Sequence, residues 1–177
     1  MNNLAPLLDL QAARAKWRSK TLWLKTARLG SYDEAADKVG DVSVSKGGRA
    51  TVTDVIAGWY EGTPVRFILS TDSGVEGFVD VNLSGTNVSR ILRDFSRFDE
   101  QFFERNPRET YKWPERVWNA IASEKVFVGM TEDQAKLSWG KPKKVNRTVL
   151  SGKATEQWVY PGGYLYFEKG VLVAIQN

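Results

Sequence analysis

The sequence contains no histidine and no cysteine. Without histidine, the Ser-His-Asp triad, histidine-based acid–base catalysis and the HExxH zinc site are excluded. Without cysteine, thiol nucleophiles, disulfides and thiolate metal sites are excluded as well. Most of the common catalytic routes are therefore closed, and we expect a protein that is not an enzyme and that uses no cofactor.

The chain also lacks a long apolar run. No segment approaches the roughly 18 apolar residues that a membrane-spanning helix needs. The first ten residues contain no basic side chain, and Pro6 and Asp9 interrupt their apolar stretch, which is not the pattern of a signal peptide. We expect a protein of the periplasm or outer membrane if a signal peptide has been removed, and otherwise a cytoplasmic one.

What is present is an ordinary globular composition. The 177 residues are 42% hydrophobic and 26% charged, and this length suits one domain or two small ones. Aromatic residues make up 12% of the chain and include seven tryptophans. Because large rings bury much apolar area per residue, we interpret most of them as core.

The net charge of +4 is unevenly distributed. Residues 1–88 hold ten basic and ten acidic side chains, whereas residues 89–177 hold fifteen and eleven. Most of the excess falls between Lys136 and Lys153, a stretch with no acidic residue. Such a stretch can attract nucleic acid, anionic lipid or an acidic protein surface, or it can simply be a solvated face.

The first half of the chain predicts a helix followed by a small β-sheet or barrel. Pro6–Trp17 has a helical apolar stripe, and Thr21–Lys25 is typical of a strand. Ser31 is a suitable cap for a short helical turn, and Gly40 is expected in a loop. Further strands are expected at 50–57, 64–71 and 77–81, with turns at 58–62 and 72–74 and a closing segment at 83–87.

A different pattern begins at Asn87. Apolar residues recur at helical spacing from Val88 to Phe103, which predicts one helix or two short ones connecting the two halves. Asn106-Pro107 is expected to end it, since a residue before proline avoids α geometry. The resulting division is 1–88 for the β-rich domain, 89–112 for the helical connector and 113–177 for a C-terminal unit.

The C-terminal unit has the clearest local signals. Trp113-Pro114 is expected to open a helix with proline at its first position. Thr131 and Gln134 form a capping-box pattern at the start of a second helix, and Gly140 is expected to end it in a left-handed conformation. Three or four antiparallel strands follow, at 144–150, 154–160, 163–168 and 171–176, with turns at 151–152, 161–163 and 169–170.

The stretch from Gly129 to Gln176 contains a Gly-Met-Thr turn, a helix ending in Trp139-Gly140-Lys141-Pro142, a Trp158-Val159-Tyr160 strand and a closing hairpin over 165–172. In this order the motifs resemble those of the SmpA/OmlA (BamE-like) family of envelope lipoprotein modules. The resemblance, over about 126–177, implies a two-helix, three-strand module that binds proteins or supports outer-membrane assembly, without catalytic residues. No lipobox cysteine is present, and much of the motif serves the fold itself.

A second resemblance is confined to Ser73–Val79, which looks like the closing motif of bacterial SH3-like domains. It implies a barrel within about residues 49–88 that binds peptide or cell wall. A plain β-hairpin accounts for the same residues equally well.

Three functional hypotheses follow. The first is a non-catalytic protein-interaction module of the bacterial envelope, whose partner is an envelope or outer-membrane component. The second is a binder of nucleic acid or anionic membrane through the Lys136–Lys153 stretch. The third is an enzyme that uses paired carboxylates, Asp72 with Glu76 or Asp80.

The candidate partner-binding surface lies where the basic loop meets exposed tyrosines of the predicted sheet. Its residues are Lys141, Lys143, Lys144, Arg147, Tyr160 and Tyr164. Tyrosine rings add contact area at low entropic cost and arginine supplies forked donors, so this combination suits an acidic or peptide-like partner.

Overall fold

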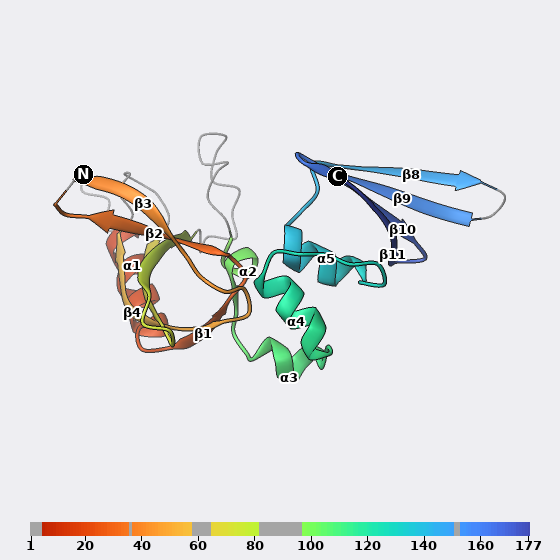
Figure 1. Cartoon of the computed structure of the whole chain (residues 1–177). Helices are drawn as coiled ribbons and strands as arrows, with labels where there is room; N and C mark the ends of the chain where they lie inside the picture. The colour runs from red at the N-terminus through yellow and green to blue at the C-terminus, as the bar shows by residue number, and fades with distance from the viewer. Residues whose placement is uncertain (1–4, 36, 58–64, 82–96, 151–152) are drawn as a thin grey trace. The chain divides into compact units, whose positions relative to one another are not determined.

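The computed structural model describes residues 5–35, 37–57, 65–81, 97–150 and 153–177 (Figure 1). The chain divides into two units, residues 1–111 and residues 112–177. Both combine helices with antiparallel sheet, which confirms the mixed α and β class. The turns expected at 58–62 and 151–152, the closing segment at 83–87 and most of the expected connecting helix lie outside the described residues.

The first unit consists of a seven-stranded sheet with helices. Its elements are α1 (Ala5–Trp17), β1 (Thr21–Leu24), β2 (Arg28–Asp33), β3 (Lys38–Ser43), β4 (Arg49–Ala57), β5 (Val65–Thr71), β6 (Glu76–Val81), α2 (Phe98–Gln101), β7 (Phe102–Phe103) and α3 (Pro107–Tyr111). The strand order is β3-β2-β6-β5-β4-β1-β7, and every described pairing is antiparallel. The helix at 6–17 and the strands at 21–25, 50–57, 64–71 and 77–81 are confirmed within a residue or two.

The core of the first unit is built from alternating residues of β4 and β5. Val52, Phe67 and Leu69 are fully buried because every second side chain of a strand points to the same face. Trp17 at the end of α1 packs on this face and stacks on Phe98 with ring centroids 4.3 Å apart. Phe102 stacks on Phe67 at 5.7 Å and completes the aromatic cluster.

Two local expectations in this unit are wrong. Ser31, expected to cap a helical turn, and Gly40, expected in a loop, are direct partners in the β2–β3 hairpin. Phe102 and Phe103, expected in the connecting helix, form β7 and pair with Leu24 and Trp23. In both places cross-strand pairing overrides a local helical or turn preference, since tertiary context outweighs intrinsic propensity.

The second unit consists of two helices and a four-stranded sheet. Its elements are α4 (Glu115–Ala122), α5 (Glu132–Trp139), β8 (Lys144–Leu150), β9 (Lys153–Tyr160), β10 (Gly163–Glu168) and β11 (Val171–Gln176). The strand order is β11-β10-β9-β8, and all pairings are antiparallel. The fourth strand is one more than the resemblance implies.

The helices cover one face of this sheet. Trp118 and Ile121 of α4 and Ala135 of α5 share a buried cluster with Trp158 and Phe167 of the strands. Trp158 and Phe167 lie in contact with ring centroids 4.3 Å apart. We call this side the helix face of the sheet and the opposite side the open face.

The ends of α5 follow from the sequence. The Thr131 hydroxyl accepts from the Gln134 backbone N–H at 3.4 Å, and the Gln134 side-chain oxygen accepts from the Thr131 N–H at 3.0 Å, which is the capping box expected. Gly140 caps the other end with φ 81° and ψ −170°, a region open essentially to glycine alone. Its φ is positive as expected, although its ψ lies outside the left-handed helical region. In α4, Pro114 is the N-cap residue and not the first helical position.

Candidate functional site: a basic sheet edge

The candidate site starts where α5 ends. After Gly140 the chain runs through Lys141, Pro142 and Lys143 into β8. The Lys143 N–H donates to the Val159 carbonyl at 2.9 Å, so the loop is joined to the sheet before β8 begins. We call the four cations Lys141, Lys143, Lys144 and Arg147 the basic edge, because they occupy the entry to β8 and the strand itself, and all four are exposed.

The strand register assigns these cations to different faces. Lys144, Val159, Tyr164 and Gln176 form one row across the four strands, on the open face. Arg147 lies opposite Glu156, which in turn lies opposite the buried Phe167, so this row belongs to the helix face. Lys144 and Arg147 therefore lie on opposite faces of β8, so the basic edge is not a patch on a single face.

Arg147 forms an ion pair with Glu156 of the neighbouring strand, and that contact is loose. Its Nε lies 3.9 Å from a Glu156 carboxylate oxygen, and the arginine side chain is 68% exposed. Glu156 also accepts a hydrogen bond from the Trp158 indole at 3.0 Å. An exposed pair at this distance is screened by water and contributes little to stability, so most of the positive field of Arg147 is directed to solvent.

The two tyrosines of the predicted surface do not lie together. Tyr164 is exposed on the open face, two strands away from Lys144 in the same row. Tyr160 lies on the helix face and is half-buried: its ring packs edge-on against Trp139 at 5.3 Å, and its hydroxyl donates to the Gly140 carbonyl at 3.0 Å. The expectation that Tyr160 is exposed is therefore wrong, whereas its contact with a partner stays a prediction.

Tyr160 has a structural position at the end of α5. Its hydroxyl satisfies a carbonyl that the helix leaves without an intrahelical partner. Burial raises the pKa of Tyr160 to about 12, since the phenolate would lose hydration there. The side chain thus remains a neutral donor at physiological pH and ties the start of the basic edge to the sheet.

The open face carries a polar network that the sequence did not reveal. Asn146 donates to Gln157 at 3.0 Å, Gln157 donates to the Tyr166 hydroxyl at 3.0 Å, and that hydroxyl donates to Gln176 at 2.7 Å. One residue from each strand takes part, so the network orders the open face from β8 to β11. The sequence indicated only that these polar residues alternate with buried ones. The strand register shows which of them are neighbours in the network.

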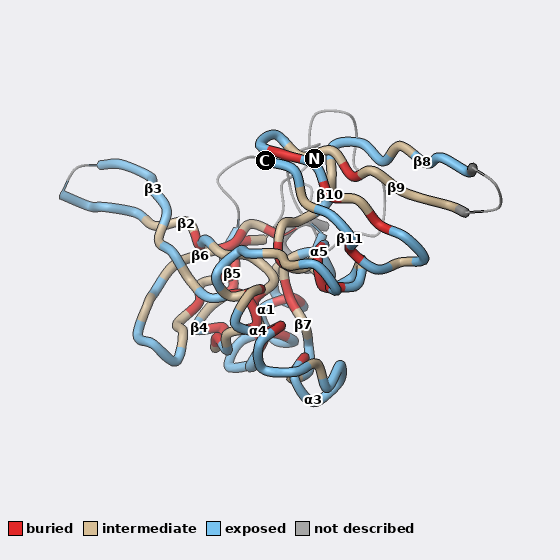
Figure 2. The backbone as a smooth tube through the Cα atoms, turned by 45° about the vertical axis from the view of Figure 1, so that its right-hand side comes forward, coloured by how far each residue is buried: buried red, intermediate tan, exposed pale blue. Residues whose placement is uncertain are grey.

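The strands of the four-stranded sheet differ in solvent exposure. Figure 2 shows β8 exposed along almost all of its length, whereas β10 alternates between buried and exposed residues. On the helix face of β8, Val145 is 46% exposed and Val149 is 66% exposed. β8 therefore offers apolar side chains as well as cations to a partner.

Two acids of the enzymatic hypothesis, Asp72 and Asp80, lie against arginines. Asp72 accepts both of its contacts from the Arg49 Nε, at 2.8 and 3.0 Å, and Asp80 forms a forked pair with Arg66 at 2.7 Å. Arg66 also lies 3.6 Å from the centroid of the Phe78 ring, which itself packs on Gly30. Asp72 and Asp80 thus each face their own guanidinium.

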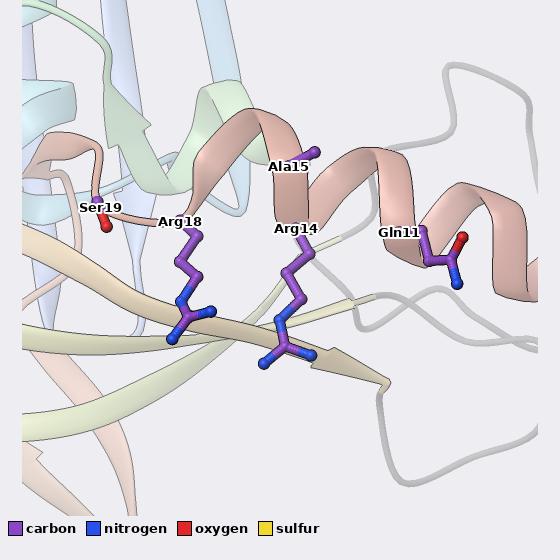
Figure 3. A pocket seen from close by; sticks show the side chains of 5 residues that line it. All are labelled: Gln11, Arg14, Ala15, Arg18 and Ser19. Carbon is purple, nitrogen blue, oxygen red and sulfur yellow. The ribbon is translucent and has the colours of Figure 1, made fainter.

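A second basic feature lies on α1. Figure 3 shows Arg14 and Arg18 extending from the same side of the helix into an open hollow that Gln11, Ala15 and Ser19 also line. The Arg14 guanidinium binds Asp54 of β4 at 2.8 Å, which attaches α1 to the sheet. This contact accounts for Arg14 as a structural residue of the first unit.

The described ranges hold neither a metal-binding cluster nor a membrane-spanning helix. Among residues 5–35, 37–57, 65–81, 97–150 and 153–177, no three histidine, cysteine, aspartate or glutamate side chains gather in a way that could hold a metal ion. In the same ranges no helix has both the length and the apolar character needed to span a membrane.

Comparison with known proteins identifies no relative. The chain matches no family model, no curated protein and no solved structure.

Proposed function

We propose that this chain is a non-catalytic protein-binding component of the bacterial envelope, that its C-terminal unit is a BamE-like module, and that the basic edge is its binding surface. The first support is the order of elements: two helices precede the antiparallel strands, and the family-like motif residues lie at the helix cap, the helix end and the hairpin. A role for the first unit as an SH3-like domain rests on Ser73–Val79 alone, and this proposal does not depend on it.

The observation that carries the proposal is the concentration of charge. Residues 112–177 hold ten basic and six acidic side chains, whereas residues 1–111 hold fifteen of each. The whole net charge of the protein thus belongs to the C-terminal unit, and four exposed cations of that unit occupy a single sheet edge. Such a field increases the rate of encounter with an acidic partner and favours acidic over basic partners.

Affinity capture from a bacterial envelope extract tests this proposal. The wild type is compared with a variant in which Lys141, Lys143, Lys144 and Arg147 are changed to glutamate. The matched control changes four other cations of the same unit to glutamate, namely Lys112, Arg116, Lys125 and Lys169. We expect the edge variant to lose a protein that both the wild type and the control retain.

The outcomes separate the alternatives. Identical protein lists from all three forms would remove the basic edge from consideration. Salt-sensitive capture of DNA, RNA or anionic vesicles by the wild type and the control, without a protein partner, would support the second hypothesis instead, because binding to phosphates weakens steeply with salt.

A further inference from the structure

The two edges of the four-stranded sheet differ in how their backbone is covered. At the β11 edge, the segment Gly129–Glu132 lies alongside the strand: the Leu172 N–H donates to Met130 at 2.8 Å, and the Gly129 N–H donates to Leu172 at 2.8 Å. Thr131 and Val171 form an antiparallel bridge there, and the Glu132 N–H donates to Gly170 at 3.2 Å. The β11 edge is thus partly covered by the chain itself.

The β8 edge has no such cover within the part of the chain that the structure describes. β8 pairs with β9 on one side, and no described strand pairs with it on the other. Its seven residues therefore present backbone donors and acceptors in the spacing of a strand. An exposed edge of this kind is a template for an additional strand.

The side chains of β8 indicate what kind of strand would fit. On the helix face, the exposed Val145 and Val149 flank Arg147; on the open face, Lys144 is followed by the polar Asn146 and Thr148. A strand added antiparallel to β8 would meet these residues one by one, with direct neighbours on the same face. The best-matched strand would have an apolar residue opposite Val149 and Val145, a polar residue opposite Thr148 and Asn146, and an acidic residue opposite Arg147 and Lys144.

The same charges disfavour a second copy of this chain as the occupant. Pairing β8 with β8 of another copy would bring Lys143, Lys144 and Arg147 of one molecule beside the same cations of the other. Like charges in neighbouring positions of paired strands destabilise the pairing, and lysine on an edge strand commonly prevents self-association. An acidic segment has the opposite effect, since each carboxylate meets a cation.

We infer that β8 binds an extended acidic segment of another protein, which adds to the sheet as a fifth, antiparallel strand. The inference rests on the proposed function and specifies its partner: a segment in which carboxylates at the third and sixth positions alternate with β-branched residues. The backbone hydrogen bonds would supply affinity, and Lys144, Arg147 and the two valines would supply selectivity.

NMR titration of the full-length chain with a synthetic probe tests this inference. The probe is acetyl-Val-Thr-Glu-Thr-Val-Glu-Glu-amide. We expect the amide shift changes to be concentrated in residues 143–149 and the affinity to fall as the salt concentration is raised. A Lys143/Lys144/Arg147→Glu variant that keeps the wild-type spectrum elsewhere should bind the probe about tenfold more weakly or worse.

Two N-methylated peptides separate strand addition from attraction by charge alone. One is methylated on residues 1, 3 and 5 of the probe and the other on residues 2, 4 and 6, so they share charge and composition. A strand uses only alternate N–H groups at one edge, so one of the two should bind about tenfold more weakly than the other. Equal binding of both would overturn strand addition.

The failures of this inference and of the proposed function are distinguishable. The two methylated peptides could bind equally while capture from the envelope extract still depends on the basic edge. That result would support the proposed function and overturn the addition of a fifth strand. A dimer of the full-length chain in sedimentation velocity that Lys144→Glu strengthens would also overturn the inference, because it would identify a second copy as the occupant.

Discussion

In the first unit, three arginines lie in close contact with aspartates, whereas the ion pairs Lys136–Glu132 and Arg147–Glu156 of the second unit are longer. Arg14–Asp54, Arg49–Asp72 and Arg66–Asp80 each join neighbouring elements of the first unit at 2.7–2.8 Å. The second unit has Lys136–Glu132 at 3.7 Å and Arg147–Glu156 at 3.9 Å among the described residues. The shorter arginine pairs attach elements of the first unit to one another. The longer pairs of the second unit neutralise their cations less, so more of the positive potential reaches solvent.

The type of cation explains part of this difference. Arginine presents a planar fork that matches a carboxylate, as in the two contacts of Arg66 with Asp80, and the Arg66 side chain is only 9% exposed there. Lysine is a strongly hydrated point charge and favours solvent. Three of the four cations of the basic edge are lysines. A paired guanidinium is thus a structural element here, whereas the exposed ammonium groups of the basic edge contribute a positive potential that acts at longer range.

The largest expected effect tests whether the two units have separate cores. Trp158 is buried to 1% exposure, and Trp158→Ala should lower the free energy of unfolding of the second unit by about 3–5 kcal/mol through lost burial and the cavity left behind. Urea denaturation followed by amide NMR signals from each unit is the measurement. We expect signals of residues 112–177 to move to lower urea while those of residues 5–81 stay unchanged.

Phe67→Ala in the first unit is the matched control and should show the reverse pattern. If either substitution shifts the signals of both units together, the chain unfolds as a single cooperative core and the comparison between the units loses its basis.

The next effect concerns the backbone at the start of the basic edge. Gly140→Val should lower the free energy of unfolding of the second unit by about 1–3 kcal/mol, because φ 81° with ψ −170° is strained for any residue with a Cβ atom. Thermal and urea unfolding measure it. Gly162→Val is the control: a Cβ at either glycine would meet no atom within 4 Å, but only Gly140 of the two has a positive φ. Equal costs at both positions would mean that the conformation of Gly140 is unimportant.

The smallest effect separates the two tyrosines. Tyr160→Phe removes the hydrogen bond to Gly140 and should cost about 1 kcal/mol, whereas the exposed Tyr164→Phe should cost nothing measurable. Because the folded pKa of Tyr160 is about 12 and the unfolded value is about 10, its contribution is fully present below pH 10 and is lost as the pH rises toward 12.

Unfolding free energies measured between pH 9 and 12 provide the check. The wild type and Tyr164→Phe should lose stability more steeply over pH 10–12 than Tyr160→Phe does. Parallel curves for all three forms would show that Tyr160 titrates like an exposed tyrosine and does not hold the end of α5.

Much of the second unit followed from signals that act within a few residues. Three of these signals are the capping box at Thr131, the glycine at the end of α5 and the two-residue spacing of Trp158 and Tyr160 on one strand face. Each depends on the backbone geometry of a single turn or a single strand. Such signals locate helices and strands because the relevant hydrogen bonds and side-chain directions are set locally. The basic residues of the edge were evident in the same way, as a run with no acid in it.

The arrangement of these parts depended on contacts between residues far apart in the chain. Phe102 is a strand residue because it pairs with Leu24, and the backbone N–H of Lys25 donates to Gln101 at 2.8 Å. Pairings over such separations compete with local helical preference, and only the packed sheet decides between them.

The division of the candidate site between two faces was likewise a tertiary result. Tyr160 and Tyr164 lie on opposite faces because the turn pairs Gly163 with Tyr160 and Tyr164 with Val159, and a shift of one residue would place both tyrosines on the same face. The position of β8 at the edge depends on which strand pairs with which. Local chemistry therefore supplied the cations and the strand, whereas the pairing of the whole sheet decided that these cations line an open edge.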